Sequence, residues 1–162
     1  MGCRAAHCSR LKNLETSAVT DQPIQQSISI AATPENVWRA LTEPDMIAAW
    51  MLGARVESTW QPGSDIAYTV KMPGLDKLYR DRGTVLVAES GRRLKYSHWS
   101  EAAGLPDTPE NRSVIMFRLD ARTEDTLLTL LHEHLPSYAA YKHAEFFWGY
   151  ALGDIKQMLE NT

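Results

Sequence analysis

The chain has 162 residues, enough for one domain with a sizeable core, and its 44% apolar and 23% charged residues are ordinary for a globular protein. A formal net charge of -3 gives no polybasic signal, so the composition argues against a nucleic-acid partner, and no apolar run is as long as a membrane span. The two cysteines, Cys3 and Cys8, are too few for a disulfide framework.

Residues 1–22 begin with a mildly basic stretch, but the continuous apolar segment of a secretory signal does not follow. We therefore expect a disordered or poorly ordered tail and a cytoplasmic protein, with one domain over residues 23–162. We assign no metal to Cys3 and Cys8, because reduced thiols in a tail explain this pair.

The first half of the predicted domain starts with a strand and two short helices. Residues 24–32 alternate apolar and polar side chains, which is typical of a strand with one buried face. Thr33 is a good N-cap and Pro34 suits the first helical position, so a helix should begin here and end near residues 42–44. A second short helix is expected over residues 45–50.

Consecutive alternating segments with short turns then predict an antiparallel meander with one buried face. A long helix over residues 137–160 closes the chain, because apolar side chains recur along it at three- and four-residue steps. This helix needs a large apolar surface to cover, and the sheet supplies one. The strands are expected at residues 54–60, 65–71, 79–89, 93–99, 113–120 and 126–134.

Several pieces of this sequence match a known family pattern: residues 28–44 (ISIAATPENVWRALTEP), Trp50, residues 83–85 (GTV), 93–99 (RLKYSHW), 126–133 (TLLTLLHE), and 148–150 (WGY) with Leu152 and Leu159. Together with the order of elements, they resemble the START-like (SRPBCC) superfamily, which includes birch-pollen-allergen-like proteins and polyketide cyclases. Within it, the chain looks like the family named for the activator of the heat-shock-protein ATPase. The resemblance covers about residues 24–160. His98, followed by Trp99, departs from the aromatic or apolar residue that many relatives carry there.

The resemblance implies an α+β helix-grip fold, in which a seven-stranded curved antiparallel sheet wraps around the long C-terminal helix. Such folds often leave a cavity between helix and sheet, and relatives bind lipids, hormones or polyketides. Fold alone does not choose among these functions.

Strand alternation indicates which side chains face the last helix. They form a largely apolar set with a few polar tips, which suits a pocket for a small molecule. Each tyrosine also has a structural explanation, since a core tyrosine packs its ring and hydrogen-bonds its hydroxyl nearby. The predicted ligand-binding residues are Trp50, Tyr68, Tyr96, His98, Phe117, Leu130, His132, Tyr141 and Trp148.

His98 and His132 are the sharpest candidates, because imidazole can act near neutral pH. They should lie two strands apart, which is far for a shared metal. The run His132-Glu133-His134 lacks the helical spacing of a zinc protease, and we expect His134 at the rim or in solvent. We assign no catalytic residue, metal or cofactor.

Three functions remain open at this point. The first is binding of a small hydrophobic or amphipathic molecule between sheet and helix. The second is a cyclase or dehydratase acting on a polyketide-like substrate, with His98 or His132 as acid or base; a His–carboxylate or His–Tyr hydrogen bond in the cavity would favour it. The third is a co-chaperone-like interaction module, which an exposed apolar patch would favour.

Two further surfaces carry alternatives of their own. Residues 76–82 form a charged run, read either as a solvated hairpin edge or as a source of Arg80 or Arg82 for an acidic headgroup. Gly149 and Gly153 in the last helix indicate either close contact with a partner helix in a homodimer or relief of crowding against a loop.

Overall fold

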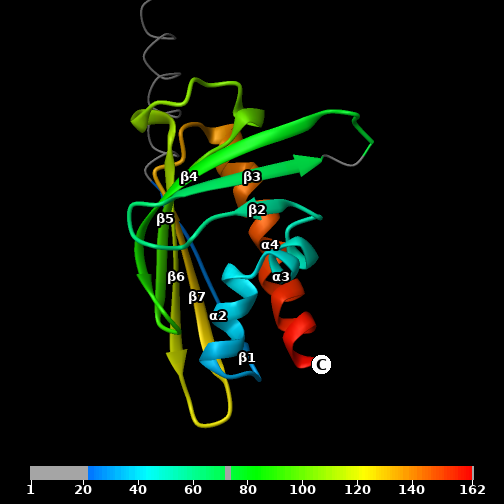
Figure 1. The fold of residues 1–162 in the computed structure, drawn as a ribbon, viewed down its shortest axis with the longest axis vertical. Helices are drawn as coiled ribbons and strands as arrows, with labels where there is room; N and C mark the ends of the chain where they lie inside the picture. Colours follow the sequence, from blue (N-terminus) through cyan, green and yellow to red (C-terminus); the bar gives the residue numbers. More distant parts are fainter. Residues whose placement is uncertain (1–21, 72–73, 162) are drawn as a thin grey trace, which may run out of the picture.

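The computed structural model describes residues 22–71 and 74–161, and its elements confirm the helix-grip expectation (Figure 1). Seven strands form one antiparallel sheet in the order β1-β7-β6-β5-β4-β3-β2, and the last helix runs along its concave side. The elements are β1 (Ile24–Ile30), α2 (Pro34–Thr42), α3 (Pro44–Trp50), β2 (Arg55–Glu57), β3 (Asp65–Lys71), β4 (Leu78–Glu89), β5 (Arg93–Trp99), the 3-10 turns η1 (Glu101–Ala103) and η2 (Pro109–Asn111), β6 (Ser113–Ala121), β7 (Thr126–Glu133) and α4 (Tyr138–Glu160).

The helix starts follow from their capping residues. The Thr33 hydroxyl accepts a hydrogen bond from the Asn36 amide at 3.2 Å, and Pro34 occupies the first turn of α2. Ser137 does the same for α4, accepting from the Ala140 amide at 3.1 Å. Each cap satisfies a backbone N–H that the helix itself leaves unpaired, so both predicted starts are correct to within a residue.

Two strands end earlier than expected, and a left-handed residue lies beyond each end. The strand predicted over residues 54–60 is shorter in the structure, where β2 ends at Glu57. Trp60 has φ of +58°, and its amide donates to the Ser58 hydroxyl rather than to a neighbouring strand. β7 stops before His134, whose φ is +59°. Such backbone angles are uncommon for residues other than glycine and cannot continue a pleated strand. The expected tail and residues 72–73 of the predicted loop lie outside the described residues.

The core lies between the concave face of the sheet and one stripe of α4, as the periodicity predicts. The buried stripe consists of Ala144, Trp148, Ala151, Leu152, Ile155 and Leu159. Helices α2 and α3 add Val37, Leu41, Ile47 and Trp50 to the same core. Among the helices of the described residues, none is long and apolar enough to cross a bilayer.

Candidate functional site

The concave face of the sheet changes character along its length. Towards the turn between β6 and β7 its side chains are largely apolar, with Leu94, Leu119 and Leu128 buried, and the buried Thr126 hydroxyl donates to the Ala32 carbonyl. Towards the end where β7 leads into α4, the strand register brings polar side chains onto the same face. Tyr68 of β3 lies opposite Asp81 of β4, and His98 of β5 lies opposite Gly83. The sheet therefore has an apolar region and a polar end.

Tyr68, Asp81 and His98 make up what we call the polar cluster. The His98 Nε2 atom lies 3.2 Å from the Asp81 Oδ2 atom, and the His98 and Tyr68 rings meet edge to face at 5.7 Å. Because Gly83 carries no side chain, the His98 ring can extend diagonally across that position to Asp81. The side chains of His98 and Asp81 remain 23% and 14% exposed, so the polar cluster reaches solvent.

Asp81 is the functional candidate that sequence reasoning missed, because it stands in a charged run between two arginines. The signal was available: Tyr79, Asp81 and Gly83 alternate with Arg80 and Arg82, so the carboxylate shares the face of Val85. Arg80 and Arg82 lie on the opposite, convex face, in register with Thr69 and Ala67.

The two tyrosines of this region are neutral hydrogen-bonding groups. Burial raises the pKa of Tyr68 well above its usual range, with further contributions from the neighbouring Tyr96 and from Asp81. Burial also raises the pKa of Tyr96. Both hydroxyls therefore keep their protons at any physiological pH. Because the two hydroxyls also hydrogen-bond to each other, one of their two protons is shared between them and the other can be donated to a ligand oxygen.

His132 differs from His98, because both of its ring nitrogens have partners inside the protein. The Trp148 Nε1–H donates to His132 Nδ1 at 3.1 Å, which leaves the ring proton on Nε2, 2.8 Å from the Ser113 hydroxyl. That hydroxyl can donate in turn to the His98 carbonyl at 3.4 Å. Burial lowers the pKa of His132 to about 3, and the nearby His98 adds to this shift. His132 is thus a neutral, fully hydrogen-bonded core residue.

The remaining predicted site residues form an aromatic wall beneath the polar cluster. Trp148 lies at its centre, with the ring of Phe117 at 5.6 Å and that of Trp50 at 6.3 Å. The ring of Tyr96 follows at 6.4 Å from Phe117. Leu130 is fully buried in the same core, whereas Tyr141 is half-buried and packs against it. All nine predicted residues therefore contact the core between sheet and α4, and they differ in how far they reach solvent.

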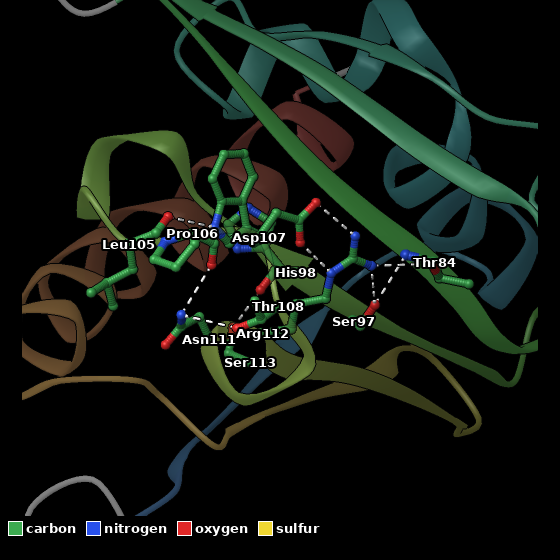
Figure 2. Close-up of polar contacts among 11 residues, drawn as sticks. Thr84, Ser97, His98, Leu105, Pro106, Asp107, Thr108, Asn111, Arg112 and Ser113 are labelled. Carbon is green, nitrogen blue, oxygen red and sulfur yellow. Dashed lines mark hydrogen bonds and ion pairs between the residues drawn. The ribbon is translucent and has the colours of Figure 1, made fainter.

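The loop between β5 and β6 lies at this end of the sheet (Figure 1) and is held by hydrogen bonds at both of its ends. At the start of the loop, the Glu101 amide donates to Asp81 Oδ1 at 3.1 Å and the Arg80 amide donates to the Glu101 carboxylate at 2.7 Å. At the far end, the Arg112 guanidinium pairs with Asp107 on one side and reaches Thr84 and Ser97 on the other, as Figure 2 shows. Asp81 therefore binds both His98 and the loop.

A separate groove of about 280 Å³ lies between α2, the β2–β3 loop and the end of β4. Trp60 is fixed there by a hydrogen bond from its indole to the Thr42 carbonyl at 2.8 Å. None of the predicted site residues lines this groove, whose lining is Trp38, Thr42, Thr59, Trp60, Gln61, Ala88 and Ser90.

The chemistry available at the polar end is that of hydrogen bonding and proton transfer. Residues 22–71 and 74–161 contain no group of three or more His, Cys, Asp or Glu side chains placed to hold a metal ion. Asp81 can orient the His98 ring and stabilise its protonated form, and Tyr68 can donate to an oxygen beside it.

Comparison with known proteins gives both a family match and structural matches. The profile of the family described as "Activator of Hsp90 ATPase homolog 1-like protein" matches residues 31–160. The solution structure of ChR145 from Cytophaga hutchinsonii is 35% identical over 86% of this chain and 94% of its own, with a TM-score of 0.73. No curated protein sequence matches the chain.

Two more distant structures share the fold. The Aha1 dimer from Colwellia psychrerythraea is 21% identical over 86% of this chain and 96% of its own, with a TM-score of 0.68. DynU16, described as a putative protein in the dynemicin biosynthetic locus, is 20% identical over 86% of this chain and 48% of its own, with a TM-score of 0.67. At these identities the likeness concerns the fold.

Proposed function

The chain belongs to the family of activator of Hsp90 ATPase homolog 1-like proteins, and we propose that it uses this fold to bind a small hydrophobic or amphipathic molecule between the sheet and α4. One observation carries the proposal. His98 and Asp81 are partly exposed polar groups at the end of an otherwise apolar concave face. A largely apolar wall with a few convergent polar groups is the usual composition of a small-molecule site.

The binding mode follows from this change from apolar to polar side chains along the concave face. The apolar part of the ligand would lie against the aromatic wall, entering past the half-buried Tyr141 and Val70. Its polar end would meet the polar cluster. Burial of the apolar part supplies most of the free energy, at about 25 cal/mol per Å² of apolar surface, and the polar contacts fix orientation.

The test has two parts and uses the full chain. Native mass spectrometry of protein purified without added ligand should show a reproducible small-molecule adduct. Titration with N-phenyl-1-naphthylamine, a neutral probe that fluoresces in apolar surroundings, should saturate at one molecule per chain in wild type and weaken at least tenfold in Tyr141→Ala. A clean mass together with no saturable fluorescence would reject the proposal.

A second candidate function is catalytic, and the contact between His98 and Asp81 favours it. In this reaction His98 Nδ1 takes a proton from carbon beside a ketone, the electron pair moves onto the ketone oxygen, and Tyr68 donates a hydrogen bond to that oxygen. Asp81 stabilises the imidazolium that forms. A relative of similar fold stands in the dynemicin biosynthetic locus, which is compatible with such chemistry.

Hydrogen–deuterium exchange at the carbons beside the carbonyl of 4-phenylbutan-2-one, followed by proton NMR in D₂O, tests the catalytic function. Wild-type protein should accelerate exchange, and His98→Gln should remove the acceleration while leaving probe binding intact. Equal exchange rates with wild type, with the variant and with no protein would exclude His98 as a base towards ketones. The co-chaperone-like function stays a prediction.

We also propose a second copy of this chain as the partner of the outward face of α4. Phe146 and Tyr150 are 67% and 60% exposed there, and their rings meet edge to face with centroids 5.0 Å apart. A Cβ atom added at Gly149 or Gly153 would meet nothing within 4 Å, so crowding inside the chain does not require these glycines. Close approach of a second helix would require them, because a larger side chain would keep the two helices apart.

Charge favours an antiparallel arrangement of the two helices. His143 and Lys142, which pairs with Glu145 at 3.2 Å, precede the aromatic pair, and Asp154 follows it with no ion pair of its own in the part of the chain described. A two-fold axis at the level of residue 148 would set Phe146 of one copy opposite Tyr150 of the other, and Lys142 and His143 of each copy near Asp154 of its neighbour. The Aha1 relative is a dimer, which is compatible with this proposal.

Light scattering coupled to size exclusion tests the dimer. Wild type should dimerise as its concentration rises, Phe146→Ser should be monomeric, and the control Leu75→Ser, at a 52% exposed leucine of the β3–β4 loop, should behave as wild type. A monomeric wild type at all concentrations would refute the dimer without bearing on ligand binding.

A further inference from the structure

We infer that the polar cluster selects a neutral, hydroxyl-bearing ligand and rejects carboxylates such as fatty acids. This inference rests on the proposed binding function and names the class of ligand that the site would take. Three observations support the inference: the charges on the concave face, the hydrogen-bond donors and acceptors of the polar cluster, and the position of the basic residues on the convex face.

All lysine and arginine side chains of the described strands face away from α4. Following the register, Arg55, Lys71, Arg80, Arg82, Arg93, Lys95 and Arg118 alternate with the inward residues and lie on the convex face. Among the described strand residues of the concave face, Asp81 is the one carboxylate, and there is no Lys or Arg. The His98–Asp81 pair carries a charge of -1 or 0, according to whether His98 is neutral or protonated. The polar cluster is therefore never positive.

With a neutral His98, an anionic headgroup would lose its hydration beside Asp81, whose side chain is only 14% exposed, without gaining a cationic partner. With a protonated His98, it would compete with Asp81 for an imidazolium whose charge Asp81 already balances. Transfer of an unpaired carboxylate into such a site is costly, and a nearby like charge adds to the cost. Lys77, which precedes β4, lies over the ring of Tyr79 at 4.8 Å and is exposed, so solvent screens its charge.

The hydrogen-bonding groups point to a hydroxyl. Asp81 already accepts from His98 and from the Glu101 amide, one bond at each oxygen. His98 Nδ1 has no partner among the described residues, so a neutral His98 offers an acceptor there, and the hydrogen-bonded hydroxyls of Tyr68 and Tyr96 together offer one donor. A ligand O–H can donate to the imidazole and accept from the tyrosine, whereas a carboxylate can only accept. An alcohol or a phenol therefore uses both groups.

Protonated amines are excluded for a different reason. An ammonium group would be attracted by Asp81, but it would lose its own hydration at a carboxylate whose two oxygens each already accept one hydrogen bond. It also has no lone pair with which to accept a hydrogen bond from a tyrosine hydroxyl. The three headgroups thus rank with the alcohol first.

The experiment compares octan-1-ol, octanoate and octylamine, which share one chain length and differ in the headgroup. Binding to the ¹⁵N-labelled full chain is followed at pH 8 by the backbone amides of residues 66–70 and 94–98 and by the Trp148 indole N–H. Octan-1-ol should shift these signals with a dissociation constant at least tenfold lower than that of octanoate or octylamine.

Asp81→Asn supplies the matched variant without the charge. Its amide oxygen can accept from the Glu101 amide, and its NH2 group faces His98 Nε2, which makes that nitrogen the acceptor and leaves the ring proton on Nδ1. The variant should narrow the preference for octanol over octanoate at least threefold, whereas Asp120→Asn, which removes an exposed carboxylate from the convex face, should leave the preference unchanged.

The outcomes separate the inference from the function on which it rests. Octanoate or octylamine binding as tightly as octanol, with the same signals shifted, would overturn the headgroup inference while ligand binding stands. An octanol preference that survives unchanged in Asp81→Asn would overturn the role given to Asp81. No shift with any of the three compounds would overturn both the inference and the proposed site.

Discussion

Lowering the pH from 7 to 5 should cost this protein about 2 kcal/mol of folding free energy through His132 alone. The pKa of this buried histidine is about 3 in the folded protein and 6.5 when unperturbed. Because the folded value is the lower one, the unfolded chain binds the extra proton first. The contribution to stability is complete above about pH 6.5, falls by about 1.4 kcal/mol per pH unit below it, and is lost as the pH approaches 3.

The magnitude has a structural cause. Protonating His132 requires a proton on Nδ1, the atom that accepts the hydrogen bond from the Trp148 indole at 3.1 Å. The charged ring would break this bond and place two N–H groups face to face in a site only 5% exposed. A loss of about 2 kcal/mol at pH 5 is a large share of the 5–15 kcal/mol by which typical domains are stable.

Urea unfolding followed by tryptophan fluorescence between pH 4.5 and 8 measures this effect. His132→Gln is the matched variant, because its amide oxygen can accept from Trp148 and its amide nitrogen can donate to Ser113, while the side chain does not titrate. Below about pH 6.5, the difference in unfolding free energy between wild type and variant should change by about 1.4 kcal/mol per pH unit. If the two proteins lose stability in parallel, the reasoning about His132 is refuted.

Two further predictions concern backbone packing and ligand binding. Gly83→Ala should destabilise the protein by about 1–3 kcal/mol, because the added Cβ would collide with the Ser97 carbonyl oxygen. Gly149→Ala should instead stabilise α4 by up to about 1 kcal/mol, because the Cβ added there meets no atom within 4 Å. Urea unfolding of both variants checks this, and equal effects would contradict the assignment of Gly83. Tyr141→Ala should weaken binding of N-phenyl-1-naphthylamine more than Arg80→Ala, since Tyr141 packs at the core and Arg80 faces outward. Equal losses in the titration would argue against an apolar-driven site.

The sequence predicted the fold well where one face of an element is buried. Alternation along β3 and β5 assigned Tyr68, Tyr96 and His98 to the concave face, and the register confirms each of them. The period of α4 identified Trp148 and its neighbours as the buried stripe. In these elements the burial pattern repeats over several residues, so a shift of register would expose the whole set.

Prediction failed where a single residue leaves the local pattern. Trp60 reads as the end of a strand, but its indole binds the Thr42 carbonyl 18 residues away and its backbone is left-handed. Asp81 reads as part of a solvated run, because charge suggested the surface although alternation placed it inside. Both depend on tertiary partners, since a hydrogen bond to a distant carbonyl or histidine outweighs the preference of the residue itself.

His98 and His132 gave the same signal in the sequence and have different properties in the structure. Each stands at the inward position near a strand end, and the two strands flank β6. In His132, Nδ1 accepts a hydrogen bond from Trp148 and Nε2–H donates one to Ser113. His132 can therefore neither bind a ligand atom nor exchange a proton without losing one of these buried hydrogen bonds. His98 uses only Nε2, for Asp81, and keeps 23% of its side chain exposed. The completeness of the hydrogen bonds, rather than the identity of the residue, therefore assigns any chemistry on this face to His98 and a structural role to His132.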